Sequence, residues 1–371
     1  MSKINIKTLT SVHIGSGNTF QNKTDFVLGQ DQEGNNVISI INPDKVLNLI
    51  GQEKYHIDTW VMGIEKGRST KDVVSQFAPN AKLEDFSERI LTNWATIKDS
   101  DSLKEFLHDG LGRPYIPGSS IKGAIRTALL ASVAGKLQDN EKPIKNSRGE
   151  ISASTIEKKL FGSDPNKDVF RFLQVGDAIF SREDEMIAIR MFNINERDKN
   201  SFWDTSKSQV IEVLSNDVTA TFNMKINHNA YNNAYGNVCD MPVCMRNLNS
   251  LFQTINRHTI QLLEEEIDYW KERENAPNAG EEVGDYLKRI QEMLDEAKSS
   301  APNSCVIRIG HGSGWRFITG AWTESLDEFH QVIVPKARPG NFKYEQFDFP
   351  KTRRVDDACE LLGFVRLTLV E

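Results

Sequence analysis

An eleven-residue run, Ile116–Arg126, constrains the local fold more than any other part of this 371-residue chain. Pro117 and Gly118 end an extended segment because both residues favour chain reversal. Ser119 or Ser120 can then cap a helix through a hydroxyl oxygen. The run therefore predicts a strand, a sharp reversal and a helix over about 119–137.

Two basic side chains follow the reversal. Lys122 and Arg126 are four residues apart and share one face of the predicted helix, beside its positive end. Gly123 removes a side chain from the first turn, which helps when a ligand must approach the backbone. Free amides, hydroxyls and cations at a helix start favour a phosphate. Simple helix capping explains the same residues, and the run alone leaves both explanations open.

The motifs of nucleotide-binding and hydrolytic enzymes do not fit. Gly118 and Gly123 have the spacing of a phosphate loop, but residues 124–125 are Ala-Ile where Lys-Ser/Thr is required. A dinucleotide-binding GxGxxG pattern fails at residues 15–20 and again at 310–317, where phenylalanine replaces the third glycine. A nucleophile elbow also fails, because the residues before Ser313 do not fit GxSxG.

The run resembles the signature of the RAMP proteins of CRISPR effector complexes, which carry Ile-Pro-Gly-Ser-Ser-Ile/Leu-Lys-Gly-x-x-Arg at the start of a helix. Three further segments extend the likeness along the chain: Val12–Gly17, Arg308–Trp315 and Phe349–Arg354. Their order and spacing resemble the type III-A (Csm) subunit at the 3′ end of the CRISPR RNA.

This resemblance implies an α+β fold with a ferredoxin-like (RRM-like) core, helical insertions and a second, degenerate RRM-like C-terminal part. It implies a non-catalytic subunit that binds CRISPR RNA, caps the backbone filament at the RNA 3′ end and contributes to RNA maturation and antiviral defence. The implied partners are CRISPR RNA, target RNA, the RAMP backbone subunit, the small helical subunit and host nucleases. The resemblance also implies that the protein is located in the cytoplasm, does not contact a membrane and holds neither a metal nor a cofactor.

The expected RNA-binding residues come from the glycine segments, the helix start and the basic C-terminal motif. They should contact sugar-phosphate rather than bases, because the guide sequence changes with every spacer. These residues are His13, Gly15, Ser16, Gly17, Ser119, Ser120, Lys122, Arg126, His311, Gly312, Ser313, Gly314, Lys351, Arg353 and Arg354.

The alternative is a metal-independent RAMP endoribonuclease that processes CRISPR RNA. His13 or His311 would then serve as general base, since histidine titrates near neutral pH. Asp25, after the first strand, is a weaker candidate by likeness to the aspartate of type III backbone subunits that cut target RNA. Neither histidine has a partner acid nearby in the sequence.

The rest of the chain divides by composition and periodicity. Alternating residues predict a first strand ending at His13, a turn at 15–18 and then a hairpin. A helical insertion is expected at about 44–110, and a helical hairpin over 249–298. We expect an N-terminal domain over 1–235 and a C-terminal part over 236–371.

Charge is distributed unevenly. Residues 260–300 hold 12 acidic and 5 basic side chains, so the remainder of this −7 chain carries no net charge. Residues 336–354 carry a local charge of +4 interleaved with four aromatic rings, a pattern that favours single-stranded RNA. The four scattered cysteines fit a reducing compartment better than a disulfide framework.

Overall fold

A five-stranded antiparallel sheet organises the molecule. The computed structural model describes residues 1–137, 145, 154–181, 186–194, 202–274, 281–327, 329–337 and 352–370. The strand order in this sheet is β13-β15-β1-β12-β8. The strands are β1 (Ser2–Thr8), β8 (Leu173–Val175), β12 (Thr219–Ile226), β13 (Ser304–Arg308) and β15 (Phe364–Val370).

The α+β class expected from the sequence is confirmed. Helix α5 (Gly118–Ala134) follows β1 in this sheet, and the long helix α8 (Leu248–Glu274) follows β12. With β15 as the fourth strand, the order β15-β1-β12-β8 is the one that a βαββαβ unit would give. In this sheet β1 pairs with β15, and β13 lies on the other side of β15. A second, degenerate RRM-like copy stays a prediction.

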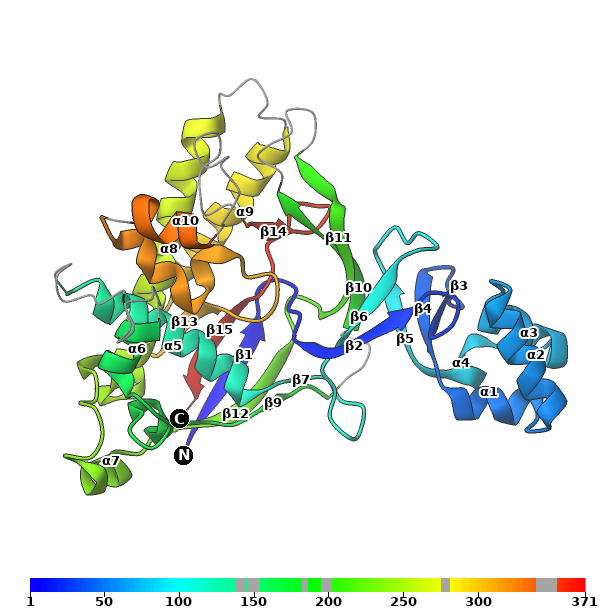
Figure 1. The fold of residues 1–371 in the computed structure, drawn as a ribbon, viewed down its shortest axis with the longest axis horizontal. Coiled ribbons are helices and arrows are strands. Elements are labelled where there is room, and N and C mark those ends of the chain that lie inside the picture. The colour runs from blue at the N-terminus through cyan, green and yellow to red at the C-terminus, as the bar shows by residue number, and fades with distance from the viewer. Residues whose placement is uncertain are drawn as a thin grey trace.

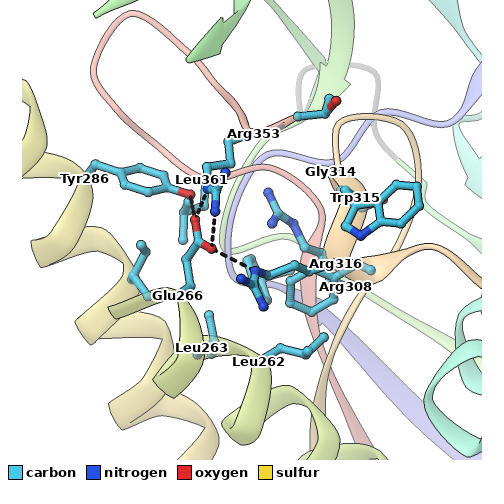
Figure 2. A pocket seen from close by; sticks show the side chains of 15 residues that line it. Leu262, Leu263, Glu266, Tyr286, Arg308, Gly314, Trp315, Arg316, Arg353 and Leu361 are labelled. Carbon is cyan, nitrogen blue, oxygen red and sulfur yellow. Dashed lines mark hydrogen bonds and ion pairs between the residues drawn. The ribbon is translucent and has the colours of Figure 1, made fainter. Parts of the chain in front are cut away.

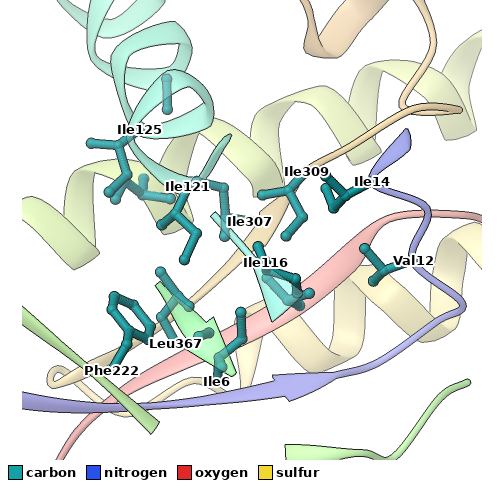
Figure 3. Packing of buried hydrophobic residues seen from close by; sticks show 14 of the residues in the cluster. Ile6, Val12, Ile14, Ile116, Ile121, Ile125, Phe222, Ile307, Ile309 and Leu367 are labelled. Carbon is teal, nitrogen blue, oxygen red and sulfur yellow. The ribbon is translucent and has the colours of Figure 1, made fainter. Parts of the chain in front are cut away.

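The main core lies between this sheet and α5. Ile4 and Ile6 point inward on β1 and are fully buried, as the alternating pattern of the strand requires. Ile121 and Ile125, four apart on α5, cover them from the helix side and are also fully buried. Figure 3 shows Ile6, Ile121 and Ile125 packed together with Ile14, Ile116 and Ile309.

A larger sheet lies beside the first. Its strand order is β2-β6-β11-β10-β5-β4-β3, and β14 pairs with one end of β10. The strands are β2 (Gly15–Gln21), β3 (Phe26–Gln30), β4 (Asn36–Ile41), β5 (Ser87–Asn93), β6 (Ser102–Phe106), β10 (Met186–Ile194), β11 (Trp203–Leu214) and β14 (Arg354–Val355). The hairpin expected after the first strand is present as β3 and β4.

Two local expectations were wrong. Residues 15–18 begin strand β2 rather than a turn, because β6 supplies ladder partners for Gly15 and for Thr19 to Gln21. The helical insertion expected over 44–110 ends at Phe86, and β5 and β6 follow it. Those strands pair with β4, β10, β2 and β11, so long-range pairing outweighs the local helical pattern.

The shorter helical insertion forms a lobe at one end of the molecule (Figure 1). Its core is a separate apolar cluster that includes Val27, Val46, Val74 and Phe86. The helices are α1 (Pro43–Ile50), α2 (Lys54–Glu65), α3 (Thr70–Phe77) and α4 (Leu83–Phe86).

On the other side, α8 and α9 (Glu281–Lys298) form the expected helical hairpin, and apolar residues of both helices pack on Val306 and Phe364. The pairing of β1 with β15 joins the two ends of the chain in one sheet, across the division expected at residue 235. That domain division stays a prediction.

The remaining short elements connect these layers. They are β7 (Tyr115–Ile116), β9 (Ala178–Ile179), α6 (Ser154–Phe161), α7 (His228–Ala234), α10 (Val334–Ala337) and short turns of helix at Val169–Phe172, Val243–Arg246, Trp315–Phe317, Thr319–Ser325 and Phe329–Ile333. None of the helices in the described ranges is long and apolar enough to cross a membrane.

The two glycines of α5 differ in their surroundings, which makes a matched test of the fold. A Cβ at position 118 would overlap the Val175 carbonyl oxygen and lie 2.8 Å from the Gly176 carbonyl oxygen, whereas one at 123 meets no atom within 4 Å. We expect Gly118→Ala to destabilise the protein by about 1–3 kcal/mol through this overlap. Gly123→Ala should stabilise it by about 0.5–1 kcal/mol through helix propensity. Denaturant unfolding of both variants measures the difference, and equal stabilities would contradict the assignment of the close contact to Gly118.

Candidate nucleic-acid interface

The two glycine segments singled out in the sequence meet in space. His13 and His311 form an antiparallel bridge, in which the His311 N–H donates to the His13 carbonyl at 2.9 Å. Gly310 has φ +77°, and a Cβ there would overlap the His13 carbonyl oxygen. Glycine is therefore required at 310 both for backbone conformation and for this close approach. Segments almost 300 residues apart in the sequence thus form one surface.

Backbone hydrogen bonds extend this surface to the helix start. The Leu107 N–H donates to the Ile14 carbonyl at 2.8 Å, and the Tyr115 N–H donates to the Leu107 carbonyl at 3.2 Å. Tyr115 is three residues before the first residue of α5. Three of the four segments that resemble RAMP motifs are therefore connected in series. Residues Ile14, Ile116 and Ile309 pack beneath them (Figure 3).

His13 is a structural residue rather than an accessible one. Its side chain is 2% exposed, and Nδ1 lies 2.6 Å from the Glu212 carbonyl, to which it donates. Burial lowers the pKa of His13, against the smaller opposing effect of this hydrogen bond. The ring meets Phe106 and His311 edge-on, with centroids 6.3 Å and 5.8 Å away. The neutral ring therefore fixes the segment that precedes β2.

His311 is partly exposed and contacts a cation. The Arg354 guanidinium lies 2.8 Å from His311 Nε2 and also donates to the Asn193 side chain at 3.2 Å. Burial, then Arg354 and then His13 lower the pKa of His311 to about 4. His311 is thus a neutral acceptor for Arg354 at pH 7. The structure brings His13, His311 and Arg354 together, as the sequence hypothesis requires.

The helix start differs from the expectation in its cap. Pro117 occupies the cap position without a side-chain hydrogen bond, so the prediction that Ser119 or Ser120 caps α5 was wrong. The Gly118 N–H donates instead to Asp177 Oδ1 at 2.7 Å. Ser119 is exposed and Ser120 half-buried in the first turn. Both hydroxyls therefore lie at the helix start without a capping role.

Of the two cations on α5, Lys122 alone fits a phosphate ligand. Partial burial lowers the pKa of Lys122, and the structure pairs it with no carboxylate among the described residues. Arg126 forms ion pairs with Glu157 and with Asp168, the latter at 2.9 Å, and its guanidinium lies over the rings of Phe161 and Phe170. These contacts fix α5 to α6 and engage the guanidinium within the chain, which disfavours a phosphate contact; the assignment of Arg126 to phosphate stays a prediction.

The second glycine loop is shaped by left-handed backbone. Gly312 and Gly314 have φ +96° and +74°, and Arg308 donates to the Gly312 carbonyl at 3.3 Å from below. Ser313 lies between them and is half-buried. A side chain at either glycine would be strained and would press on Leu362 and Met191 at 312 or on the Thr352 carbonyl at 314, so the two glycines allow the loop to pack closely on its neighbours.

Basic residues beside this loop have buried partners. Glu266 accepts hydrogen bonds from the Arg353 guanidinium, the Trp270 indole and the Tyr286 hydroxyl, as Figure 2 shows in part. Arg316 forms ion pairs with Glu266, Glu265 and Glu324. A cavity of about 30 Å³, room for one water, is lined in part by Glu266, Arg316 and Arg353.

Arg353 and Arg316 therefore stabilise the core, and the buried ion pair of Arg353 disfavours the expected RNA contact, which stays a prediction. Although burial opposes ionisation, the two guanidinium groups hold the pKa of Glu266 below its usual value. Lys351 and most of the basic segment 336–354 lie outside the described residues. Among the described residues of that motif, Arg354 contacts His311 through its guanidinium, and the Thr352 carbonyl accepts from the Trp315 N–H at 3.2 Å.

Sequence reasoning missed a buried ion network beneath β2. The Glu212 carboxylate is fully buried and accepts hydrogen bonds from Arg89 at 2.9 and 3.0 Å and from the Phe106 N–H at 2.9 Å. Arg89 also donates to Glu105 at 3.2 Å. One signal was present: Glu212 interrupts the apolar run Val210–Leu214. A charge within a buried strand indicates a specific partner.

Asp25, the further catalytic candidate, has a structural role. Asp25 Oδ2 accepts the Gln21 N–H at 2.8 Å, so this carboxylate stabilises the turn before β3. Cys239 and Cys244 are free and half-buried. Within the described ranges no three His, Cys, Asp or Glu residues gather in a way that could hold a metal ion.

The low pKa of His311 predicts a pH-dependent stability. The unfolded chain protonates this ring near pH 6.5, whereas the folded protein keeps it neutral down to about pH 4. The unfolded state therefore binds more protons in this window, and stability falls as the pH is lowered from 6.5 to 4. We expect His311→Asn to reduce the loss between pH 7 and pH 5 by on the order of 1 kcal/mol. Urea unfolding at both pH values measures this loss, and an unchanged pH dependence would contradict the neutral state of the half-buried His311.

Comparison with known proteins places this geometry in a family. The structure is similar to a chain in the cryo-EM structure of a Csm–crRNA–target RNA ternary complex of a type III-A CRISPR-Cas system, with a TM-score of 0.71 and 18% identity over 100% of both chains. It is also similar to the crystal structure of T. onnurineus Csm5, with a TM-score of 0.64 and 16% identity over 97% of this chain and 99% of that one. At these identities the likeness shows a shared fold.

Sequence comparison gives the family directly. No curated protein matches the chain. The RAMP superfamily matches residues 5–317, a range that includes the His13 segment, the start of α5 and the 310–314 loop. The chain therefore belongs to the RAMP superfamily.

Proposed function

We propose that this protein is a non-catalytic CRISPR RNA-binding subunit of a type III-A (Csm) complex that caps the backbone filament at the RNA 3′ end. The observation that carries the proposal is the hydrogen-bonded series that joins His13, Ile14, Leu107 and Tyr115 to α5 and to His311. It makes one continuous surface from segments that are far apart in the sequence. The whole-length likeness in fold to Csm subunits supports the same conclusion.

The surface suits sugar-phosphate rather than bases. Gly15 and Gly17 leave exposed backbone on β2, and the open space over Gly123 leaves the first turns of α5 accessible, whereas Gly312 is buried and Gly314 half-buried in the second glycine loop. Ser119, Ser120 and Lys122 add two hydroxyls and one cation there. Donors of this kind bind a guide whatever its sequence. Ser16, Ser313, His311 and Arg354 border the same surface.

The non-catalytic role rests on the state of the two histidines. A general base needs an accessible lone pair within hydrogen-bond reach of its substrate. His13 is buried, and His311 accepts from Arg354. The endoribonuclease alternative therefore lacks a poised base. Purified protein incubated with repeat RNA without metal should give no discrete products, and discrete products lost in His13→Ala would establish the alternative.

The proposed partners are CRISPR RNA, target RNA in the assembled complex, the RAMP backbone subunit, the small helical subunit and host nucleases, all in the cytoplasm. The proposed contribution to maturation is that this subunit sets where 3′ trimming stops. In a reconstituted complex without this subunit, CRISPR RNA should keep longer and less uniform 3′ ends. The same length distribution with and without the subunit would contradict the capping role.

The contrast between the two cations of α5 gives a binding test. We expect Lys122→Ala to weaken CRISPR RNA binding equally for different spacers, because it removes one phosphate contact. The slope of log affinity against log salt should fall by about 0.7, the value for one contact to a single strand. Filter binding at several salt concentrations with two unrelated spacers measures both effects.

Arg126→Ala is the matched control. Its guanidinium pairs with Glu157 and Asp168, so this variant should lose stability while a folded fraction keeps the wild-type salt slope. A wild-type salt slope in Lys122→Ala, with the fold intact, would contradict the phosphate role of Lys122.

A further inference from the structure

Strand β2 is an edge strand that is weakly held by its neighbour. Among the described strands it pairs with β6 alone, and nearly all its side chains face solvent. The register with β6 shifts between Gly15 and Thr19, so residues 16–18 leave the regular ladder. Gly17 has φ +98°, a conformation that the ladder does not impose. The shape of this segment must therefore be fixed by contacts other than strand pairing.

A single carboxylate supplies those contacts. Glu105 Oε2 accepts hydrogen bonds from Ser16 Oγ and from Asn18 Nδ2, both at 2.8 Å. The Asn18 N–H donates to Ser16 Oγ at 3.0 Å, which closes the segment on itself. The residues on both sides of Gly17 are thus held from one point on β6.

Glu105 is itself fixed from below. Its Oε1 lies 3.2 Å from the Arg89 guanidinium, and Arg89 binds both oxygens of Glu212 on β11. The side chains of Arg89 and Glu105 are 8% and 14% exposed, and that of Glu212 is 0% exposed. Although burial favours the neutral acid, bonds from Asn18 and Ser16 and the charge of Arg89 hold the pKa of Glu105 below its usual value.

The charge of this residue is unfavourable for RNA. Two carboxylates and one guanidinium leave the network with a net charge of −1 beneath a surface that would face phosphates, and like charges repel. A group placed there to attract RNA would be a cation. The presence of Glu105 is explained instead by the two hydrogen bonds that its carboxylate accepts from Ser16 and Asn18.

We propose that Glu105 is a positioning residue that holds Ser16 to Asn18 in the shape that presents their backbone to RNA, with the Arg89–Glu212 pair as its fixed support. The inference rests on the proposed RNA-binding function. In this proposal the half-buried carboxylate of Glu105, on β6, determines the shape of the glycine segment on β2. A positioning role and a charge role predict opposite signs for one substitution, so they can be separated.

The experiment compares Glu105→Ala with Glu105→Gln. Alanine removes the acceptor, and CRISPR RNA affinity should fall about tenfold, the cost of about one lost hydrogen-bond anchor. Glutamine keeps the shape, since Ser16 Oγ can accept and the Asn18 amide can turn over to accept from it. Because it also removes a negative charge, Glu105→Gln should bind RNA as tightly as wild type or more tightly. Hydrogen exchange of the 16–18 amides should be faster in Glu105→Ala alone.

Two further variants isolate the segment. Ser16→Ala combined with Asn18→Ala removes the same bonds without touching the buried network, and should reproduce the tenfold loss. Glu296→Ala removes a carboxylate that pairs with Arg366 at 2.7 Å near the end of α9, and should leave RNA affinity unchanged.

The outcomes are distinguishable. Wild-type affinity in Glu105→Ala, or tighter binding in both Glu105 variants, overturns the positioning role while leaving the proposed function intact. Failure of the wild-type protein to bind CRISPR RNA, alone and in the reconstituted complex, overturns the proposed function and the inference together. Opposite signs for alanine and glutamine, with faster exchange at 16–18 in alanine alone, support the inference.

Discussion

The antiparallel pairing of β1 with β15 is the constraint on which the rest of the structure depends. It places the first and last strands of the chain side by side, in register from Lys3–Val370 to Thr8–Val365 (Figure 1). Beyond the strands, the Gly363 N–H donates to the Ser11 carbonyl and the Leu9 N–H to the Phe364 carbonyl. These bonds carry the chain to His13, where it meets His311. Without this closure the two glycine segments would belong to separate parts of the molecule, and no shared surface would exist.

Ion pairs within the chain occupy three arginines that the sequence alone would offer to RNA. Arginine is a residue type expected at an RNA site, yet each of three arginines pairs with carboxylates of the same chain: Arg126, Arg316 and Arg353. Burying a guanidinium is costly unless a carboxylate accompanies it, so these pairs are fixed features of the core and its edges. The surface proposed to bind RNA therefore depends on main-chain amides, on Lys122 and on Arg354. Donors of this kind would contact phosphate without reading sequence, in keeping with the proposed function.

Two buried glutamates organise the molecule around this surface. Glu212 supports β2 through Arg89 and Glu105, and its carbonyl holds His13. Glu266 fixes the chain near Arg353 against α8 and α9. Each has several donors, as a buried carboxylate needs. The glycine segments contain residues that favour flexible backbone, but the polar networks around Glu212 and Glu266 hold them in place.

The sequence by itself determined the α+β class, the position of α5, the α8–α9 hairpin and the residues at the helix start, because apolar periodicity and turn residues act over a few neighbours. It also marked His13 and His311 as belonging to related segments. Tertiary structure decided what those segments do. It made Gly15–Gln21 a strand through β6, with residues 16–18 outside the regular ladder, ended the helical insertion at Phe86, and paired Arg126 and Arg353 with carboxylates of the same chain. The physical reason is range: a partner strand or a buried carboxylate from a distant part of the chain outweighs local preference, and no local pattern names that partner.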